Sequence, residues 1–247
     1  MRALLEIDRV SKAFGGVIAN NAISLSVAAG SIVGLIGPNG SGKTTLFSSI
    51  VGTHRVDGGS IRFAGRDITR LRVGEIARLG LVRTYQQTRV YRAMNCVQNM
   101  QISARLPRAS IHALFAPFAP AVTDRAEALL DFVGLYGKRN LRAGTLSFGQ
   151  QKLLEFAMAL MNEPRMLLLD EPTAGINPTL INALLERLRR ANVELGVTLL
   201  VIEHNMRALM QLAGYVYCLA HGELLAAGTP AAIRQDPRVL GAYLGGQ

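Results

Sequence analysis

Nine residues near the N-terminal end constrain the fold of this chain more than any other segment. Residues 37–45 read Gly-Pro-Asn-Gly-Ser-Gly-Lys-Thr-Thr and lie between the mostly apolar run Ser31–Ile36 and the segment Leu46–Ile50. The glycines allow a tight turn in which consecutive backbone N–H groups point inward at an anion. A helix that starts near Gly42 adds about half a positive charge at its N-terminus. The segment therefore predicts a strand, a phosphate-binding loop and a helix, in that order.

The side chains of this loop extend the prediction to a metal-bound triphosphate. Lys43 is expected to reach the β- and γ-phosphates, and the Thr44 hydroxyl is expected to ligate Mg²⁺. A glycine-rich turn without a ligand is the alternative, which the complete motif between a strand and a helix disfavours. The residues expected to bind the nucleotide here are Gly37, Pro38, Asn39, Gly40, Ser41, Gly42, Lys43, Thr44 and Thr45.

Length and composition limit the class of protein. A chain of 247 residues can form one large domain or a core with an inserted subdomain. No apolar stretch approaches the roughly 18–20 residues that span a bilayer. Because Glu6 and Asp8 follow the N-terminus so closely, we expect no signal peptide. Cys96 and Cys218 match no metal or redox spacing and are expected to be reduced and buried. These features predict a cytoplasmic chain.

The positive charge of the chain does not assign a partner. The formal net charge is +10, but the basic residues are scattered and cluster only at Arg70–Arg72 and Arg187–Arg190. Solvent-facing helices account for such clusters, so we expect no direct binding to nucleic acid.

Hydrophobic periodicity divides the chain into regions. The first ninety residues are rich in strand-like segments, such as Leu4–Val10 and Ala22–Val27, in which polar and apolar residues alternate. Between about 92 and 162 the spacing is helical, as in Ala126–Val133 and Gln150–Met161. From Arg165 onward strand-like and helical segments alternate. This order predicts an α/β protein with a helical insertion.

A second strand delivers two acids to the expected phosphate site. The apolar run Met166–Leu169 is followed by Asp170 and Glu171. Open α/β sheets bind ligands at the carboxyl ends of their strands. Asp170 is expected to hold Mg²⁺ through water, and Glu171 is expected to orient or deprotonate the water that attacks the γ-phosphate. Two solvated acids at a strand end are the alternative.

A third segment, Leu146–Gln151, predicts a helix start that offers Ser147 and the Gly149 amide to phosphate oxygens. Alone it indicates only a helix. Together with the phosphate loop and the acid pair, it resembles the signature sequence of ATP-binding-cassette ATPases, and the resemblance covers essentially the whole chain. The residues matching the signature are Ser147, Phe148, Gly149 and Gln150.

The resemblance implies a fold, cofactors and an assembly. The implied fold is a P-loop NTPase with a RecA-like core, an antiparallel β-subdomain and an inserted α-helical subdomain, all expected in one domain over 1–247. The β-subdomain and core take about 1–87 and 163–247, and the helical subdomain takes about 88–162. The resemblance further implies that the chain binds ATP and Mg²⁺ and hydrolyses ATP in a head-to-tail dimer, in which the signature of one subunit closes over the nucleotide of the other.

Further positions match the family one by one. Phe14 resembles the aromatic residue that stacks on adenine, and Gln86 resembles the glutamine that touches Mg²⁺ and the attacking water. His204 resembles the histidine that contacts the γ-phosphate, while Ala174–Pro178 resembles the loop that contacts the partner subunit. The other three histidines are expected to be structural.

Within the family, the sequence most resembles the ATPases of branched-chain or hydrophobic amino-acid importers. The stretches that carry this likeness are Phe14–Gly16, Arg83–Gln86, the insertion Leu106–Asp124, Ile202–Met206 and Ala242–Gly245. The departures from the usual pattern are Phe148, Tyr85, Gln87 and Ile176. They leave urea, short-amide and lipopolysaccharide transport ATPases open as alternatives.

This branch implies a peripheral subunit at the cytoplasmic face of the cell membrane. Its partners would be a second ATPase subunit, identical or different, transmembrane permease subunits and, indirectly, a substrate-binding protein. Thr88–Met94 resembles the region that receives the permease, with Tyr91 and Met94 as apolar contacts. An ordinary turn between subdomains is the alternative for this segment. A soluble cassette acting on nucleic acid is the rival, but the sequence shows no coiled coil, zinc cysteines or second cassette. A non-hydrolysing partner is disfavoured because Lys43 and Glu171 are intact.

Overall fold

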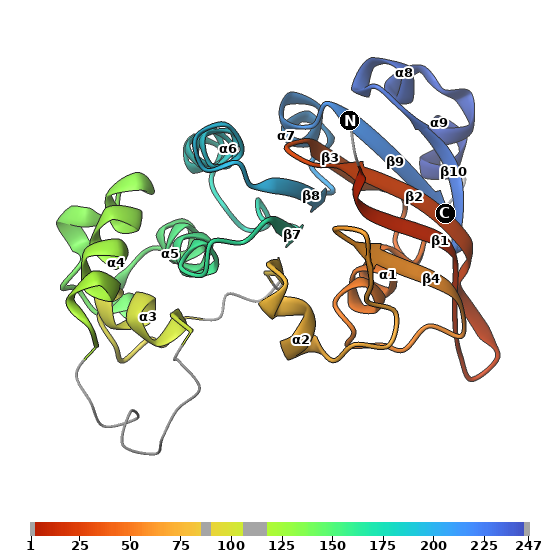
Figure 1. Ribbon diagram of the computed structural model, residues 1–247. Helices are drawn as coiled ribbons and strands as arrows, with labels where there is room; N and C mark the ends of the chain where they lie inside the picture. The colour runs from red at the N-terminus through yellow and green to blue at the C-terminus, as the bar shows by residue number, and fades with distance from the viewer. Residues whose placement is uncertain (1–2, 85–89, 106–117, 245–247) are drawn as a thin grey trace. The chain divides into compact units, whose positions relative to one another are not determined.

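The computed structural model describes residues 3–84, 90–105 and 118–244 (Figure 1). The chain forms two compact units. The core unit comprises Met1–Arg83, Arg165–Thr173 and Leu188–Gln247, and the helical unit comprises Thr84–Pro164 and Ala174–Arg187. Each unit is described by itself.

An antiparallel sheet forms one part of the core unit. Its four strands lie in the order β2-β1-β4-β5. Polar and apolar residues alternate along β1, so that Leu5, Ile7 and Val10 are buried while Glu6 and Asp8 face solvent. The strands are β1 (Ala3–Phe14), β2 (Val17–Ala28), β4 (Gly58–Phe63) and β5 (Arg66–Asp67).

A second, six-stranded sheet carries the predicted site segments. Its order is β10-β9-β3-β8-β7-β6, and all neighbours are parallel except β10 and β9. The loops that follow its parallel strands therefore leave from the same edge. β7 and β8 are buried throughout, as expected for central strands of a parallel sheet. The strands are β3 (Ile32–Ile36), β6 (Leu81–Arg83), β7 (Met166–Asp170), β8 (Thr198–Ile202), β9 (Tyr215–Ala220) and β10 (Glu223–Gly228).

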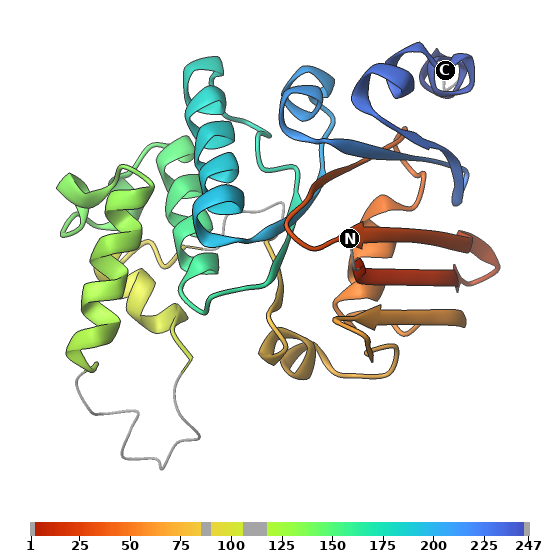
Figure 2. The same ribbon diagram turned by 45° about the horizontal axis from the view of Figure 1, so that its top comes forward.

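Helix α1 (Lys43–Ile50) joins the two sheets through one hydrophobic core. Its Leu46, Phe47 and Ile50 are fully buried and belong to a cluster that includes residues of β1, β4, β3 and β8. The other helices of the core unit are α2 (Val73–Arg78), α7 (Met206–Leu212), α8 (Pro230–Gln235) and α9 (Pro237–Leu244) (Figure 2). Helix α1, which begins at Lys43, therefore packs in a core shared with strands of both sheets.

The helical unit is built from α3 (Cys96–Ser103), α4 (Pro120–Phe132) and α5 (Phe148–Leu160), which pack on one another. Two short 3₁₀ helices, η2 (Tyr136–Lys138) and η3 (Ala143–Thr145), precede α5. Arg125 in α4 donates from Nε to the Met161 carbonyl at 2.9 Å, so α4 is also held to the end of α5. Helix α6 (Pro178–Leu195) has residues in both units.

The predicted α/β class is confirmed by this arrangement. Both cysteines are free and buried, as expected, and burial raises the pKa of Cys218 to about 11, which keeps this thiol protonated and inert. Within the described ranges, the helices are too short or too polar to cross a bilayer.

Candidate nucleotide site

The predicted phosphate loop is a tight turn between β3 and α1. Gly37 and Gly42 adopt φ angles of 147° and 95°. A Cβ at Gly37 would lie 2.1 Å from the Leu219 carbonyl oxygen, and a Cβ at Gly42 would lie 2.2 Å from that of Ala19. Side chains are therefore excluded at both positions, because neighbouring backbone approaches so closely. The first turn of α1 contains no acidic residue, so its N-terminus keeps its positive character.

Lys43 places its ammonium group inside this loop. Its Nζ donates to the carbonyl oxygens of Gly37 at 2.8 Å and Pro38 at 2.9 Å, and to the Ser41 hydroxyl at 3.2 Å. The residue is only 6% exposed. Burial lowers the pKa of Lys43, while the carboxylates of Glu171 and Asp170 act to raise it. The loop thus holds a positive charge close to the pair of acids at the end of β7, Asp170 and Glu171.

Asp170 ends β7 and is 3% exposed. Its Oδ2 accepts a charge-assisted hydrogen bond from Nη2 of Arg83, the last residue of the neighbouring strand β6, and both side chains are buried. Arg83 also donates from Nη1 to the Ser48 hydroxyl at 2.9 Å, and its guanidinium carbon lies 5.6 Å from the ring centroid of Phe47. Arg83 therefore ties β6 and β7 to α1.

Glu171 and His204 meet where β7 and β8 end. The Glu171 Oε1 lies 2.9 Å from the His204 Nε2. Glu171 has a φ of 49°, a left-handed conformation that is uncommon for a residue with a side chain. Its backbone N–H donates to the Ile202 carbonyl at 2.9 Å, which extends the β7–β8 pairing by one residue. The parallel sheet thus brings together two residues that lie far apart in the sequence.

Phe14, the residue expected to contact adenine, is 44% exposed at the end of β1. Its ring makes an edge-to-face contact with His54 at a centroid distance of 5.2 Å, and Lys12 Nζ lies 5.2 Å from its centroid. The exposed ring offers a surface for stacking. Sequence reasoning assigned His54 only a structural role and did not place it beside Phe14.

The predicted signature begins α5 in the helical unit. Ser147 Oγ accepts from the Gln150 N–H at 3.3 Å, and Gln150 Oε1 accepts from the Ser147 N–H at 3.1 Å, which forms a capping box. Phe148 is exposed and Gly149 is buried. In the predicted partner-contacting loop Ala174–Pro178, the Asn177 Oδ1 accepts from the Leu180 N–H at 2.9 Å, which caps α6.

The described residues do not include all of the predicted site residues. Gln86, Tyr85 and Gln87 lie outside the described residues, as do part of Thr88–Met94 and part of the insertion Leu106–Asp124. Tyr91 is exposed in the helical unit.

The donors fit a hard divalent cation held largely by phosphate and water. Among the described residues there is no group of three or more His, Cys, Asp or Glu side chains able to enclose a metal. Thr44, which carries a hydroxyl, is an exposed residue in the first turn of α1, and Asp170 is a carboxylate. Oxygen donors in such small number suit Mg²⁺, which keeps several waters and binds through substrate phosphates.

Tyr243 is a contact to the phosphate loop that sequence reasoning missed. It lies in α9, and its hydroxyl accepts from the Gly37 backbone N–H at 2.9 Å. Burial raises the pKa of Tyr243, and the bond from Gly37 opposes that rise. The hydroxyl therefore helps to hold the first residue of the loop. In the sequence Tyr243 is recognisable only as the aromatic residue of Ala242–Gly245, and this pattern does not indicate that its hydroxyl contacts Gly37.

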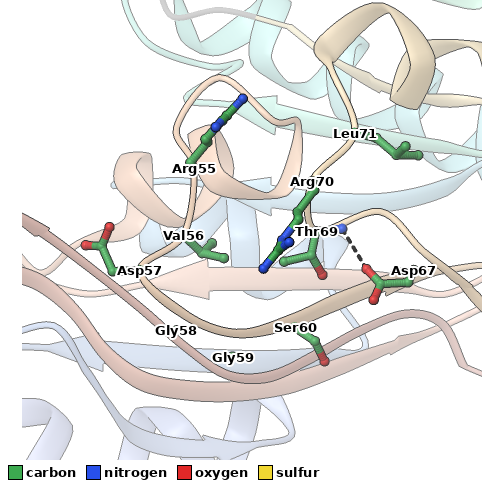
Figure 3. A pocket seen from close by; sticks show the side chains of 10 residues that line it. All are labelled: Arg55, Val56, Asp57, Gly58, Gly59, Ser60, Asp67, Thr69, Arg70 and Leu71. Atoms are coloured by element: carbon green, nitrogen blue, oxygen red, sulfur yellow. Dashed lines mark hydrogen bonds between the residues drawn. The ribbon is translucent and has the colours of Figure 1, made fainter.

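A hollow of about 820 Å³ lies elsewhere in the core unit (Figure 3). Its wall includes Arg55, Asp57 and Arg70, and the Asp67 carboxylate accepts from the Thr69 N–H at 2.8 Å. None of the predicted site residues lines this hollow. The volume of this hollow therefore does not identify it as the nucleotide site.

A phosphate loop after one parallel strand and a buried carboxylate after another define a P-loop nucleotide-binding protein. A family model described as ABC transporter matches residues 20–174, and one described as Branched-chain amino acid ATP-binding cassette transporter matches residues 223–247. The chain belongs to the ATP-binding-cassette family of transporter ATPases. ATP hydrolysis is the activity of this family.

Three curated relatives match along nearly their whole length. The high-affinity branched-chain amino acid transport ATP-binding protein BraF of Pseudomonas aeruginosa is 39% identical, with 99% of this chain and 98% of the relative covered. The high-affinity branched-chain amino acid transport ATP-binding protein LivG of Escherichia coli K12 is 36% identical, with 98% of each chain covered. The lipopolysaccharide export system ATP-binding protein LptB of Acidithiobacillus ferridurans is 36% identical, with 100% and 99% covered.

A solved structure shows the same fold. The ADP conformation of MJ1267, an ATP-binding cassette of an ABC transporter, superposes with a TM-score of 0.90 at 32% identity, with 99% of this chain and 100% of that chain covered. The fold class that the sequence predicted is thus confirmed at the level of the family.

The buried pair of Arg83 and Asp170 makes a prediction about stability. Arg83→Met should lower the free energy of unfolding by about 3–5 kcal/mol, because it leaves the Asp170 carboxylate buried beside an apolar chain. Urea unfolding followed by circular dichroism measures this change. The matched control is Arg62→Met at an exposed position of β4, for which a change within about 0.5 kcal/mol is expected. Equal losses in the two variants would contradict the role of the pair.

Proposed function

We propose that this chain is the ATPase subunit of an importer for branched-chain or other hydrophobic amino acids. The observation that carries the proposal is the full-length similarity to BraF and LivG, together with the match of residues 223–247 to the branched-chain amino acid model. LptB is nearly as similar to this chain, so lipopolysaccharide transport is the second candidate. Urea and short amides remain alternative cargoes from the sequence pattern.

The phosphate loop performs the binding step in this proposal. Lys43 holds its ammonium beside the Gly37 and Pro38 carbonyls, from which it can turn to phosphate oxygens without leaving the loop. The N-terminus of α1 supplies backbone N–H groups and a positive dipole end. Mg²⁺, when bound through Thr44 and Asp170, would neutralise negative charge on the β- and γ-phosphates. Phe14 would stack on the adenine.

Glu171 is the proposed general base. Its carboxylate is directed by the left-handed backbone at the end of β7 and lies 2.9 Å from the His204 imidazole. Glu171 would orient the attacking water and accept its proton, while His204 would contact the γ-phosphate. Gln86 is proposed to contact Mg²⁺ and the same water on the basis of its sequence match alone.

The proposed assembly is a head-to-tail dimer of ATPase subunits with two nucleotides between them. Ser147, Phe148, Gly149 and Gln150 of one subunit would close over the ATP of the other. ATP would thereby supply contacts that exist only in the closed dimer, and hydrolysis would remove them. The exposed Tyr91, with Met94, would receive a permease subunit. In this proposal the chain works at the cytoplasmic face of the cell membrane and does not bind nucleic acid directly.

The catalytic assignment predicts the behaviour of Glu171→Gln. Because the amide cannot accept the proton of the attacking water, single-turnover hydrolysis should fall by at least about 100-fold. ATP binding should persist, and the dimer should accumulate on size-exclusion chromatography with ATP. Glu6→Gln, at an exposed position on β1, is the control and should hydrolyse ATP normally. Normal turnover in Glu171→Gln would refute the assignment.

The cargo is tested by reconstitution with membrane subunits. The chain is co-purified with candidate permease subunits and placed in liposomes with a candidate substrate-binding protein. ATP turnover is then measured with leucine, isoleucine or valine, and separately with urea or lipopolysaccharide. We expect stimulation by the hydrophobic amino acids. Stimulation by lipopolysaccharide in place of the amino acids would favour the second candidate and contradict the first.

A further inference from the structure

The carboxylate of Glu203 is buried between the two loops that carry Glu171 and His204. Glu203 directly follows β8 and is 4% exposed. Its Oε1 accepts from the Thr173 N–H at 2.7 Å, and its Oε2 accepts from the Asn205 N–H at 3.3 Å. Thr173 lies on the loop after β7, and Asn205 lies on the loop after β8. One side chain therefore joins both loops.

The position of Glu203 follows from where the strand pairing stops. β7 and β8 remain in parallel register up to Asp170 and Ile202, and the N–H of Glu171 still donates to the Ile202 carbonyl. Thr173, two residues further on, is 5% exposed and needs an acceptor for its backbone N–H. Glu203 provides that acceptor where the sheet no longer does. An ionised carboxylate makes a stronger bond to a backbone N–H than a neutral oxygen does.

These two bonds bracket the proposed catalytic pair. Thr173 follows Glu171 by two residues, and His204 lies between Glu203 and Asn205 in the chain. Within the described part of the chain, no lysine, arginine or histidine forms a salt bridge with Glu203. The carboxylate of Glu203 therefore faces the backbone of the two loops and not a cation.

We propose that Glu203 is a positioning residue for ATP hydrolysis, which sets the distance between Glu171 and His204 by holding the Thr173 and Asn205 amides. The inference rests on the catalytic roles proposed above for Glu171 and His204. Glu203 does not touch the nucleotide in this account. It acts through the two loops, because small displacements of reacting groups cost large factors in rate.

Glu203→Ala removes both acceptor oxygens and tests this inference in the full-length chain. We expect kcat for ATP to fall by about 10- to 100-fold, since displacement of the Glu171–His204 pair affects the chemical step. ATP affinity, measured by fluorescence titration with a labelled ATP analogue, should stay near the wild-type value. Glu6→Ala, an exposed carboxylate on β1, is the control and should leave both quantities unchanged.

Two further variants separate positioning from general stability. Glu203→Gln keeps the size of the side chain and one acceptor oxygen, so its kcat should fall below the wild-type value but by less than in Glu203→Ala. This variant tests the inference even if Glu203→Ala does not fold. In a His204→Ala background, Glu203→Ala should lower kcat much less than it does in the wild type, because the pair it positions is already broken.

The outcomes distinguish this inference from the proposed function. Wild-type kcat in Glu203→Ala and Glu203→Gln, with Glu171→Gln inactive, would overturn the positioning role alone. Parallel losses of ATP affinity, melting temperature and kcat in Glu203→Gln would also overturn it, because they would indicate a purely structural carboxylate. Full turnover by both Glu171→Gln and His204→Ala would instead refute the catalytic roles proposed for Glu171 and His204, on which the inference rests.

Discussion

The buried carboxylate of Asp170 is the constraint on which the rest of the site depends. An ionised group at 3% exposure must be compensated by a positive charge or by hydrogen bonds. Arg83 meets this need from the adjacent strand and in turn contacts Ser48 and Phe47 on α1. The strand that delivers the acid, the strand that delivers its partner and the helix that follows the phosphate loop are therefore held together by one cluster of side chains.

The same edge of the sheet holds opposite charges close together before any ligand contributes. Lys43 is bound by loop carbonyls, and burial lowers its pKa while Glu171 and Asp170 oppose that effect. The positive charge of Lys43 in the phosphate loop can attract phosphate oxygens. The carboxylates of Asp170 and Glu171 can interact with a metal ion and with a water molecule. Such preorganised groups need little rearrangement when charge develops in the reaction. Tyr243 extends this support from the C-terminal helix to the first residue of the loop.

Local sequence patterns predicted much of this arrangement because strand, loop and helix follow one another directly in the chain. The phosphate loop, the two acids at the end of β7 and the helix start at Ser147 are features of that kind. Arg83, Tyr243 and Glu203 were missed because their function lies in contacts with distant residues; Gly37 and Tyr243 are 206 positions apart. Periodicity indicates that a side chain is buried but does not name its partner. The roles of Gln86 and of the signature across a dimer remain predictions.

The central claim is that the loop after β3 binds the triphosphate through Lys43. Isothermal titration of MgATP into wild type and Lys43→Ala tests it most directly, with Lys138→Ala, a lysine of η2 in the helical unit, as the matched control. Loss of a charge-assisted bond to phosphate predicts an affinity about 10- to 100-fold weaker in Lys43→Ala. Lys138→Ala should bind MgATP as the wild type does. Unchanged MgATP affinity in Lys43→Ala would contradict the account.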